Sequence, residues 1–102
     1  MELRAGARLK SAVDETEVIV VRPPSQPVEV WCGGHPMYEL GKEAPVGLEL
    51  DPSQADGTQL GKRYADNDLG IELLCTKAGK GTLSLAGTPL PLKDAKPLPS
   101  SD

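Results

Sequence analysis

The sequence predicts an all-β fold, and three observations carry that prediction. Its apolar stretches are short and β-branched, or alternate with polar residues as half-buried strands do. Glycine (11) and proline (10) disfavour long helices and suit strands joined by tight turns. No window of roughly eleven residues has the three- and four-residue spacing of apolar side chains that an amphipathic helix requires.

The first half of the chain begins with the clearest strand signal. Residues 17–21 are dominated by β-branched side chains, and the run ends before Pro23, which predicts a buried strand. Residues 27–32 alternate in polarity and place Cys32 on the same face as the preceding valines. We expect strands in this half near residues 7–13, 16–22, 27–32 and 37–40.

The second half repeats these signals. Ile71, Leu73 and Cys75 share one face of a predicted strand, and Leu83 and Leu85 share one face of the next. Turn-forming Gly, Pro, Asn and Asp residues separate the runs. We expect strands near residues 62–66, 70–76, 81–86 and 89–93, and one further strand at residues 46–50 in the connecting segment.

An internal repeat relates the two halves. A shift of 53 residues places residues 18–40 on residues 71–93 without a gap, and a Gly-x-Pro-apolar turn recurs at residues 34–37 and 87–90. Upstream the shift is 55, and this length change falls at the first hairpin tip, where insertions are tolerated. The sequence therefore predicts one domain over residues 1–92. Its parts are copy one at about 6–40, a connector at 41–60, copy two at about 61–93 and a flexible tail at 93–102.

One four-stranded meander of this size buries too little surface to be stable alone. Two meanders related by a pseudo-twofold axis bury their apolar faces against each other, as either a small sandwich or a partly closed barrel. Because aromatic residues are only 3% of the chain and Phe is absent, the core must be aliphatic.

Charge and composition exclude several classes of function. The net charge of −4 argues against a nucleic-acid-binding protein, which needs a basic surface. No apolar run approaches the ~20 residues of a membrane span, and the N-terminus lacks the apolar core of a signal peptide. Two cysteines are too few for a disulfide scaffold. We therefore expect a cytoplasmic protein with free thiols; a single Cys32–Cys75 bridge is the alternative if the chain is exported.

The segment from Cys32 to Met37 gathers a thiol, the only histidine and a thioether. Cys32 and His35 have the C-x-x-H interval of half a zinc site, and Cys75 is a candidate third ligand. A carboxylate such as Asp14, or a water, would have to complete the site; a Cu(I) site using Met37 is a variant. The competing interpretation is that the cysteines and Met37 are apolar core residues and that His35 is a turn residue.

Other motifs carry less chemistry. Gly79 and Lys80 resemble the end of a phosphate-binding loop, but the earlier glycine and the following helix are missing. Lys77 and Lys80 instead belong to a predicted hairpin turn that offers positive charge to a small anion. With one histidine and no nucleophile motif, we expect no enzymatic activity.

Trp31 alternates with inward-facing residues and is therefore expected to point away from the core. The two copies differ most around this tryptophan, which suggests a contact patch. We predict a small non-enzymatic cytoplasmic binding or interaction module without a cofactor, either a monomer or a weak homodimer paired through an edge strand. Its partner is a protein or small ligand, with no nucleic acid and no membrane, and its predicted site consists of Trp31, His35, Tyr38, Lys77 and Lys80. The alternative is a zinc or Cu(I) protein using Cys32, His35 and Cys75.

Overall fold

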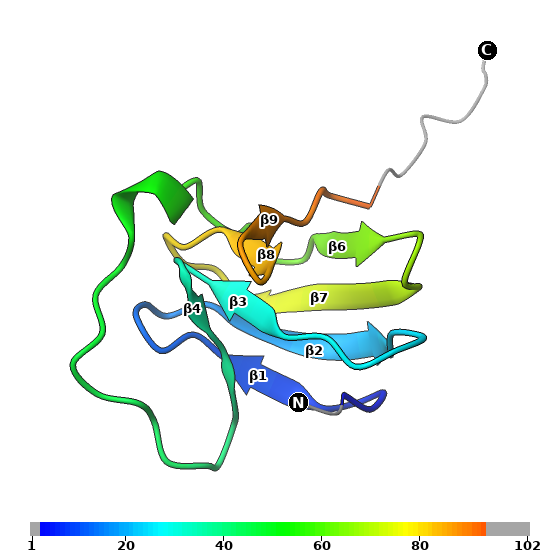
Figure 1. Cartoon of the computed structure of the whole chain (residues 1–102), viewed down its shortest axis with the longest axis horizontal. Helices are drawn as coiled ribbons and strands as arrows, with labels where there is room; N and C mark the ends of the chain where they lie inside the picture. Colours follow the sequence, from blue (N-terminus) through cyan, green and yellow to red (C-terminus); the bar gives the residue numbers. More distant parts are fainter. Residues whose placement is uncertain (1–2, 94–102) are drawn as a thin grey trace.

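Two antiparallel sheets build the chain in the computed structural model, which describes residues 3–93 (Figure 1). The predicted all-β class is confirmed, since the helical content of these residues is the short 3₁₀ turn η1 (Pro52–Gln54). The two sheets do not close into a barrel. Among the described residues, no helix combines the length and the apolar character that a membrane span requires.

The five-stranded sheet has the order β5-β1-β2-β7-β6 and the four-stranded sheet the order β4-β3-β8-β9. The strands of the first sheet are β1 (Arg8–Lys10), β2 (Glu17–Arg22), β5 (Tyr38–Glu39), β6 (Arg63–Asp66) and β7 (Ile71–Lys77). Those of the second are β3 (Val30–Cys32), β4 (His35–Pro36), β8 (Leu83–Leu85) and β9 (Thr88–Pro89).

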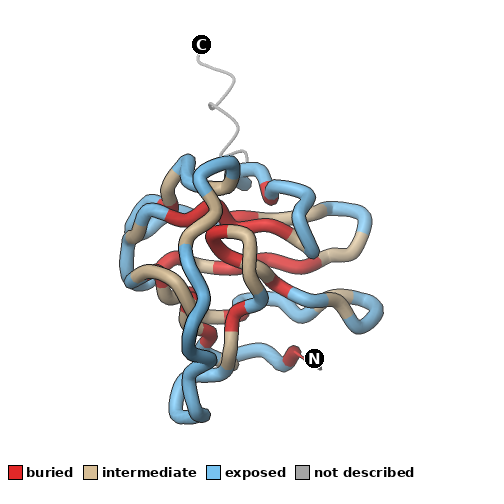
Figure 2. Tube along the Cα trace, turned by 60° about the vertical axis from the view of Figure 1, so that its left-hand side comes forward, coloured by how far each residue is buried: buried red, intermediate tan, exposed pale blue. Residues whose placement is uncertain are grey.

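Both sheets contribute to one hydrophobic core. Its fully buried members include Leu9, Val18 and Leu73 from the five-stranded sheet and Cys32 and Leu83 from the four-stranded sheet. Fully burying a Leu or Val side chain contributes about 1.5–3 kcal/mol, so these few residues hold the layers together. Figure 2 shows the buried residues along the strands and the exposed ones in the surrounding loops.

A β-bulge interrupts the central pairing of β2 with β7. Val20 lies opposite Leu73 and Arg22 lies opposite Glu72, so Val21 is the extra residue between them. A bulge of this kind reorients the side chains that follow it. It directs Arg22 to the outer face of the five-stranded sheet, and it leaves Val21 40% exposed.

The strand predicted at residues 46–50 is wrong. This stretch has no strand in the structure, and Val46 is 90% exposed. The alternation of apolar residues is genuine, but Gly47 has a φ of +80°, which an extended strand does not tolerate. The alternating segment pairs with no sheet edge and therefore forms a loop.

The strand predicted at residues 37–40 also needs correction. Residues 35–36 form β4 in the four-stranded sheet, and residues 38–39 form β5 in the other sheet. The chain thus crosses between the layers at Met37, whose side chain is buried in the core. The expected strand is therefore limited to β5, and β4 forms where a turn was expected.

The strand orders are compatible with the predicted duplication. β1 and β2 lie beside β7 and β6 in one sheet, and β4 and β3 lie beside β8 and β9 in the other. An isolated bridge between Tyr64 and Leu92 occupies the place beside β6 that β5 occupies beside β1. The duplication and its pseudo-twofold axis stay predictions. Of the predicted tail, only Lys93 lies within the described residues.

Candidate functional site

Asp14 lies in the turn between β1 and β2, and its carboxylate joins the two halves of the chain. Its Oδ1 accepts a hydrogen bond of 3.0 Å from the Thr16 N–H, and its Oδ2 accepts one of 3.2 Å from the Thr16 hydroxyl. Oδ2 also accepts a short hydrogen bond from the N–H of Gly81, 67 positions away. The Cys32 thiol approaches Oδ1 at 3.9 Å.

The pKa of Asp14 lies below its ordinary value. Partial burial by itself raises this pKa, but hydrogen bonds from the backbone N–H groups of Thr16 and Gly81 and from the hydroxyls of Ser11 and Thr16 outweigh burial. Asp14 is therefore an ionised carboxylate whose acceptor sites are occupied by the protein itself.

A cleft of about 470 Å³ adjoins this carboxylate. Its apolar lining comes from Val13, Leu50 and Ala78, and its polar lining comes from Asp14, Glu15, Gly79 and Lys80. Since Asp14 already accepts internal hydrogen bonds, Glu15 and Lys80 are the charged side chains of the lining that remain for a small ligand. Lys80 was predicted as a binding residue, whereas Leu50 was expected in a strand.

The three predicted metal ligands each contact a different group. Cys32 approaches Asp14, His35 Nε2 lies 2.9 Å from the carbonyl oxygen of Glu49, and the Cys75 thiol donates to the carbonyl oxygen of Lys77 at 3.3 Å. Within residues 3–93, no three His, Cys, Asp or Glu side chains gather in an arrangement that could hold a metal ion. The structure thus does not bring the predicted ligand set together.

Both cysteines are buried free thiols. Burial, reinforced by repulsion from the Asp14 carboxylate, raises the pKa of Cys32 to about 11. Burial also raises the pKa of Cys75. Because the thiolate is the form that binds metals and attacks electrophiles, these environments favour the apolar role of cysteine.

Trp31 lies on the outer face of the four-stranded sheet. It is directly opposite Pro36 in β4 and Ser84 in β8, and Ser84 is directly opposite Pro89 in β9. Opposed residues share a face, so these four residues form a row across the whole sheet. The prolines are exposed, the indole is half-buried and Ser84 is fully buried. The indole N–H donates to Glu29 Oε1 at 3.1 Å.

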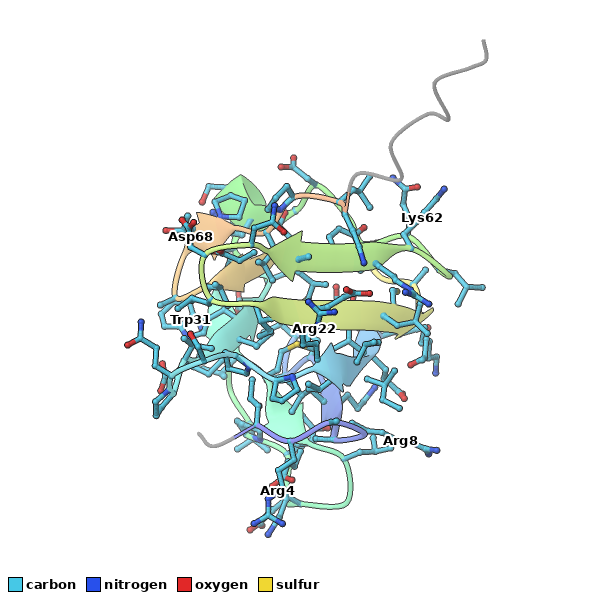
Figure 3. The ribbon with its side chains drawn as sticks, turned by 90° about the vertical axis from the view of Figure 1, so that its right-hand side faces the viewer. Arg4, Arg8, Arg22, Trp31, Lys62 and Asp68 are labelled. Carbon is cyan, nitrogen blue, oxygen red and sulfur yellow. The ribbon has the colours of Figure 1, made fainter. Side chains whose placement is uncertain are left out.

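The other predicted patch residues are distributed over both layers. Tyr38 pairs with Lys10 at the edge of the five-stranded sheet, and Lys77 lies opposite Glu17 in its middle. His35 faces Cys32 rather than Trp31, and Lys80 lies at the cleft. Figure 3 shows Trp31 at one side of the molecule, apart from the strand face that carries Arg22. Trp31 thus belongs to a face that Tyr38 and Lys77 do not share.

Sequence reasoning missed the structural role of Asp14 and Gly81. The sequence pointed to Asp14 only as a carboxylate that could complete a metal site, and it indicated no role for Gly81. A Cβ at Gly81 would lie 2.8 Å from both Cys32 Sγ and the Gly33 nitrogen, so only glycine fits this approach. The glycine pair flanking Lys80 was the only signal of a close backbone contact.

No protein-family model matches this sequence, and comparisons with curated proteins and with solved structures found no match either.

Proposed function

We propose that this chain is a small non-enzymatic binding module that contacts a protein partner through the outer face of its four-stranded sheet. The observation that carries the proposal is that Trp31 shares this face with the exposed prolines Pro36 and Pro89, while Ser84 of the same row is fully buried. Tryptophan is enriched among the residues that dominate binding energy, and here it lies between exposed prolines in an otherwise aromatic-poor chain.

The edge strands of the same sheet are poorly suited to pairing with a partner, which favours contact through the face of the sheet. β4 and β9 are its edge strands, each has two residues, and each contains a proline. Proline has no N–H to donate, so neither edge is suited to adding a strand from another molecule. The predicted pairing through an edge strand is thus disfavoured for this sheet, and the Trp31 row is the surface left for contact.

A Trp31→Ala variant tests the proposal. We expect it to weaken binding of the partner about 30-fold, because truncation of an interface tryptophan removes a central contact. Partners retained by immobilised wild-type and variant protein are compared by quantitative mass spectrometry, followed by titration of the retained protein. Leu60→Ala is the matched control, since Leu60 is 66% exposed and lies outside the strands. Equal retention by all three proteins would contradict the proposal.

A metal-binding role is the second candidate, and its only support is the presence of Cys32, His35 and Cys75. The separate partners of these residues favour the binding module instead. We expect native mass spectrometry to give the sequence mass and chelation to leave the melting temperature unchanged. A mass excess of one zinc or copper ion that chelator removes would favour the metal protein.

Two further features of the chain support parts of this proposal. The single histidine lies opposite Cys32, but its Nε2 contacts a backbone carbonyl, and burial raises the pKa of the Cys32 thiol to about 11, which disfavours a cysteine–histidine catalytic pair. Buried free thiols are compatible with a reducing compartment, so we place the module in the cytoplasm.

A further inference from the structure

The outer face of the five-stranded sheet is basic, although the whole chain has a net charge of −4. Leu9, Val18 and Cys75 face the core, so the residues alternating with them face outward. The register shifts at Val21 and Thr76 bring Arg22 and Lys77 to the same outer face, opposite Glu72 and Glu17. The cations on or bordering this face are Arg8, Lys10, Arg22, Arg63, Lys77 and Lys93, and its carboxylates are Glu17 and Glu72. The acidic residues of the chain therefore lie mostly elsewhere.

One row of this face has cations at its ends and apolar side chains between them. Arg8 lies opposite Ile19, Ile19 lies opposite Leu74, and Leu74 lies opposite Arg63. The row spans four strands, which corresponds to about 14 Å at ~4.8 Å per strand. Bulged Val21, 40% exposed, adds apolar surface beside it.

The carboxylates on the face are already paired. Glu72 is buried and binds Arg63 at 3.0 Å and Lys93 at 2.9 Å, and Glu17 lies 3.6 Å from Lys10. Arg8 and Arg22 form no ion pair within residues 3–93. Both are exposed, and Figure 3 shows Arg22 in the middle of the face with Arg8 toward its edge. These two guanidinium groups thus remain available to an acidic ligand. Arg63 contacts Glu72 through Nη1 and its side chain is 53% exposed, so it also has N–H groups left for a second carboxylate.

The chain itself carries a segment with the complementary pattern. Residues 43–49 begin and end with Glu43 and Glu49, and Val46 and Leu48 lie between these acids. Every residue of this segment is exposed, and Val46 is 90% exposed. His35 contacts Glu49 through its backbone carbonyl oxygen and not through its side chain, so the Glu49 carboxylate is left for other contacts.

The segment also starts beside the basic face. The Leu40 N–H donates to the carbonyl oxygen of Arg8 at 2.9 Å, so the loop leaves the molecule at the β1 edge. Figure 1 shows this loop projecting away from the sheets. A second molecule placed at that edge would meet both the segment and Arg8.

We propose that residues 43–49 of a second copy of this chain lie across the outer face of the five-stranded sheet. Glu43 and Glu49 bind Arg8, Arg22 and Arg63, and Val46 and Leu48 lie on Ile19, Leu74 and Val21. The two acids are at most about 20 Å apart, which is the extended length of the segment. The positive φ of Gly47 shortens this separation toward the ~14 Å row and interrupts the alternation that would place Val46 and Leu48 opposite the acids. Because each copy has both surfaces, the exchange is reciprocal and gives a closed two-fold dimer.

A protein segment fits this face better than a nucleic acid does. The row has no aromatic side chain on which bases could stack, since Tyr38 lies opposite Lys10 at the edge of the face. Glu72 lies close to the centre of the row. The apolar pair Ile19 and Leu74 is better matched by apolar side chains than by phosphates. This dimer uses a different face from the Trp31 row, so the two proposals stand independently.

Sedimentation velocity over a concentration series tests the dimer. We expect wild-type protein to dimerise in about 50 mM salt. In about 500 mM salt the dissociation constant of the dimer should be at least tenfold higher, because salt screens exposed ion pairs. Arg8→Glu/Arg22→Glu and Glu43→Arg/Glu49→Arg should each be monomeric under conditions where wild type is dimeric. An equimolar mixture of the two variants should restore a dimer, because their charges are again complementary.

The control is Asp56→Arg/Asp68→Arg, which makes the same charge change at two exposed positions outside the segment and should leave the dimer intact. Trp31→Ala should also remain dimeric, which separates this result from that of the proposed partner surface. Monomeric wild type at about 1 mM protein and low salt would overturn the proposal. So would a dimer that survives in both double variants, or a mixture without rescue. Binding of a fluorescent oligonucleotide by a monomeric wild type would reassign the face to nucleic acid.

Discussion

Replacing Asp14 with alanine is expected to lower the free energy of unfolding by about 3 kcal/mol. The substitution removes the acceptor of the N–H and hydroxyl of Thr16 and of the Gly81 N–H. Thr16 is fully buried, so water cannot easily replace the lost carboxylate. A buried donor left without a partner costs about 1–3 kcal/mol, and the contact between the two hairpin turns is lost as well.

Urea denaturation of wild type and variant measures this loss. Asp66→Ala is the matched control, because Asp66 Oδ1 accepts from the backbone N–H groups of Asp68 and Leu69 in the turn between β6 and β7. That turn lies near the surface, so we expect the control to lose about 1 kcal/mol or less. Equal losses in the two variants would show that Asp14 is an ordinary turn residue.

The same carboxylate should contribute to acid sensitivity. The pKa of Asp14 is lower in the folded protein than its ordinary value of 3.8. Its contribution to stability is therefore complete above the pKa of the unfolded chain, and it is lost as the pH falls through the lowered folded pKa. In Asp14→Asn this part of the pH dependence should disappear. Glu72 and Asp51, whose pKa values are also lowered, should keep a smaller acid dependence in the variant.

Gly79→Ala should destabilise the protein by about 3 kcal/mol for a steric reason. A Cβ at this position would overlap the Thr16 hydroxyl and lie 2.7 Å from the Thr16 nitrogen. That nitrogen is backbone and already donates to Asp14, so it cannot move without breaking the turn. Thermal and urea unfolding should both show the loss, with no change in the m-value.

Gly41→Ala is the matched control for the glycine substitution. Gly41 has a φ of +96°, but a Cβ there would meet nothing within 4 Å. We expect only the conformational penalty of a left-handed alanine, about 1 kcal/mol. If Gly79→Ala is no more damaging than Gly41→Ala, close packing of the Gly79 loop against Thr16 does not contribute to stability.

The sequence was sufficient to predict the central strands because a strand buried on one face requires apolar residues at alternate positions. β2 and β7 lie where β-branched runs and alternation placed them, and Cys32 and Met37 are buried as their apolar alternatives predicted. The segment at residues 46–50 has the same alternation, yet it forms no strand. An alternating segment forms a strand only if its backbone angles allow it and a free sheet edge is available for pairing. The pattern of polar and apolar residues indicates neither.

The candidate site was harder to predict for a related reason. The partner of Asp14 is Gly81, 67 positions away, and no local pattern identifies it. Tyr38 is close to Trp31 in the sequence, but the crossing at Met37 moves it to the other sheet. The predicted patch was therefore wrong because it relied on proximity along the chain. The row from Pro36 to Pro89 depends instead on pairing between strands of the two halves.

The pairing of β2 with β7 also determines when the chain can fold during synthesis. Each sheet has its middle pair formed by one strand from each half, β2 with β7 and β3 with β8. The first half therefore emerges from the ribosome with each of its two central strands lacking one of its two neighbours. Cooperative folding must wait until residue 85 is clear of the exit tunnel, which makes the nascent chain dependent on protection of its apolar strands until then.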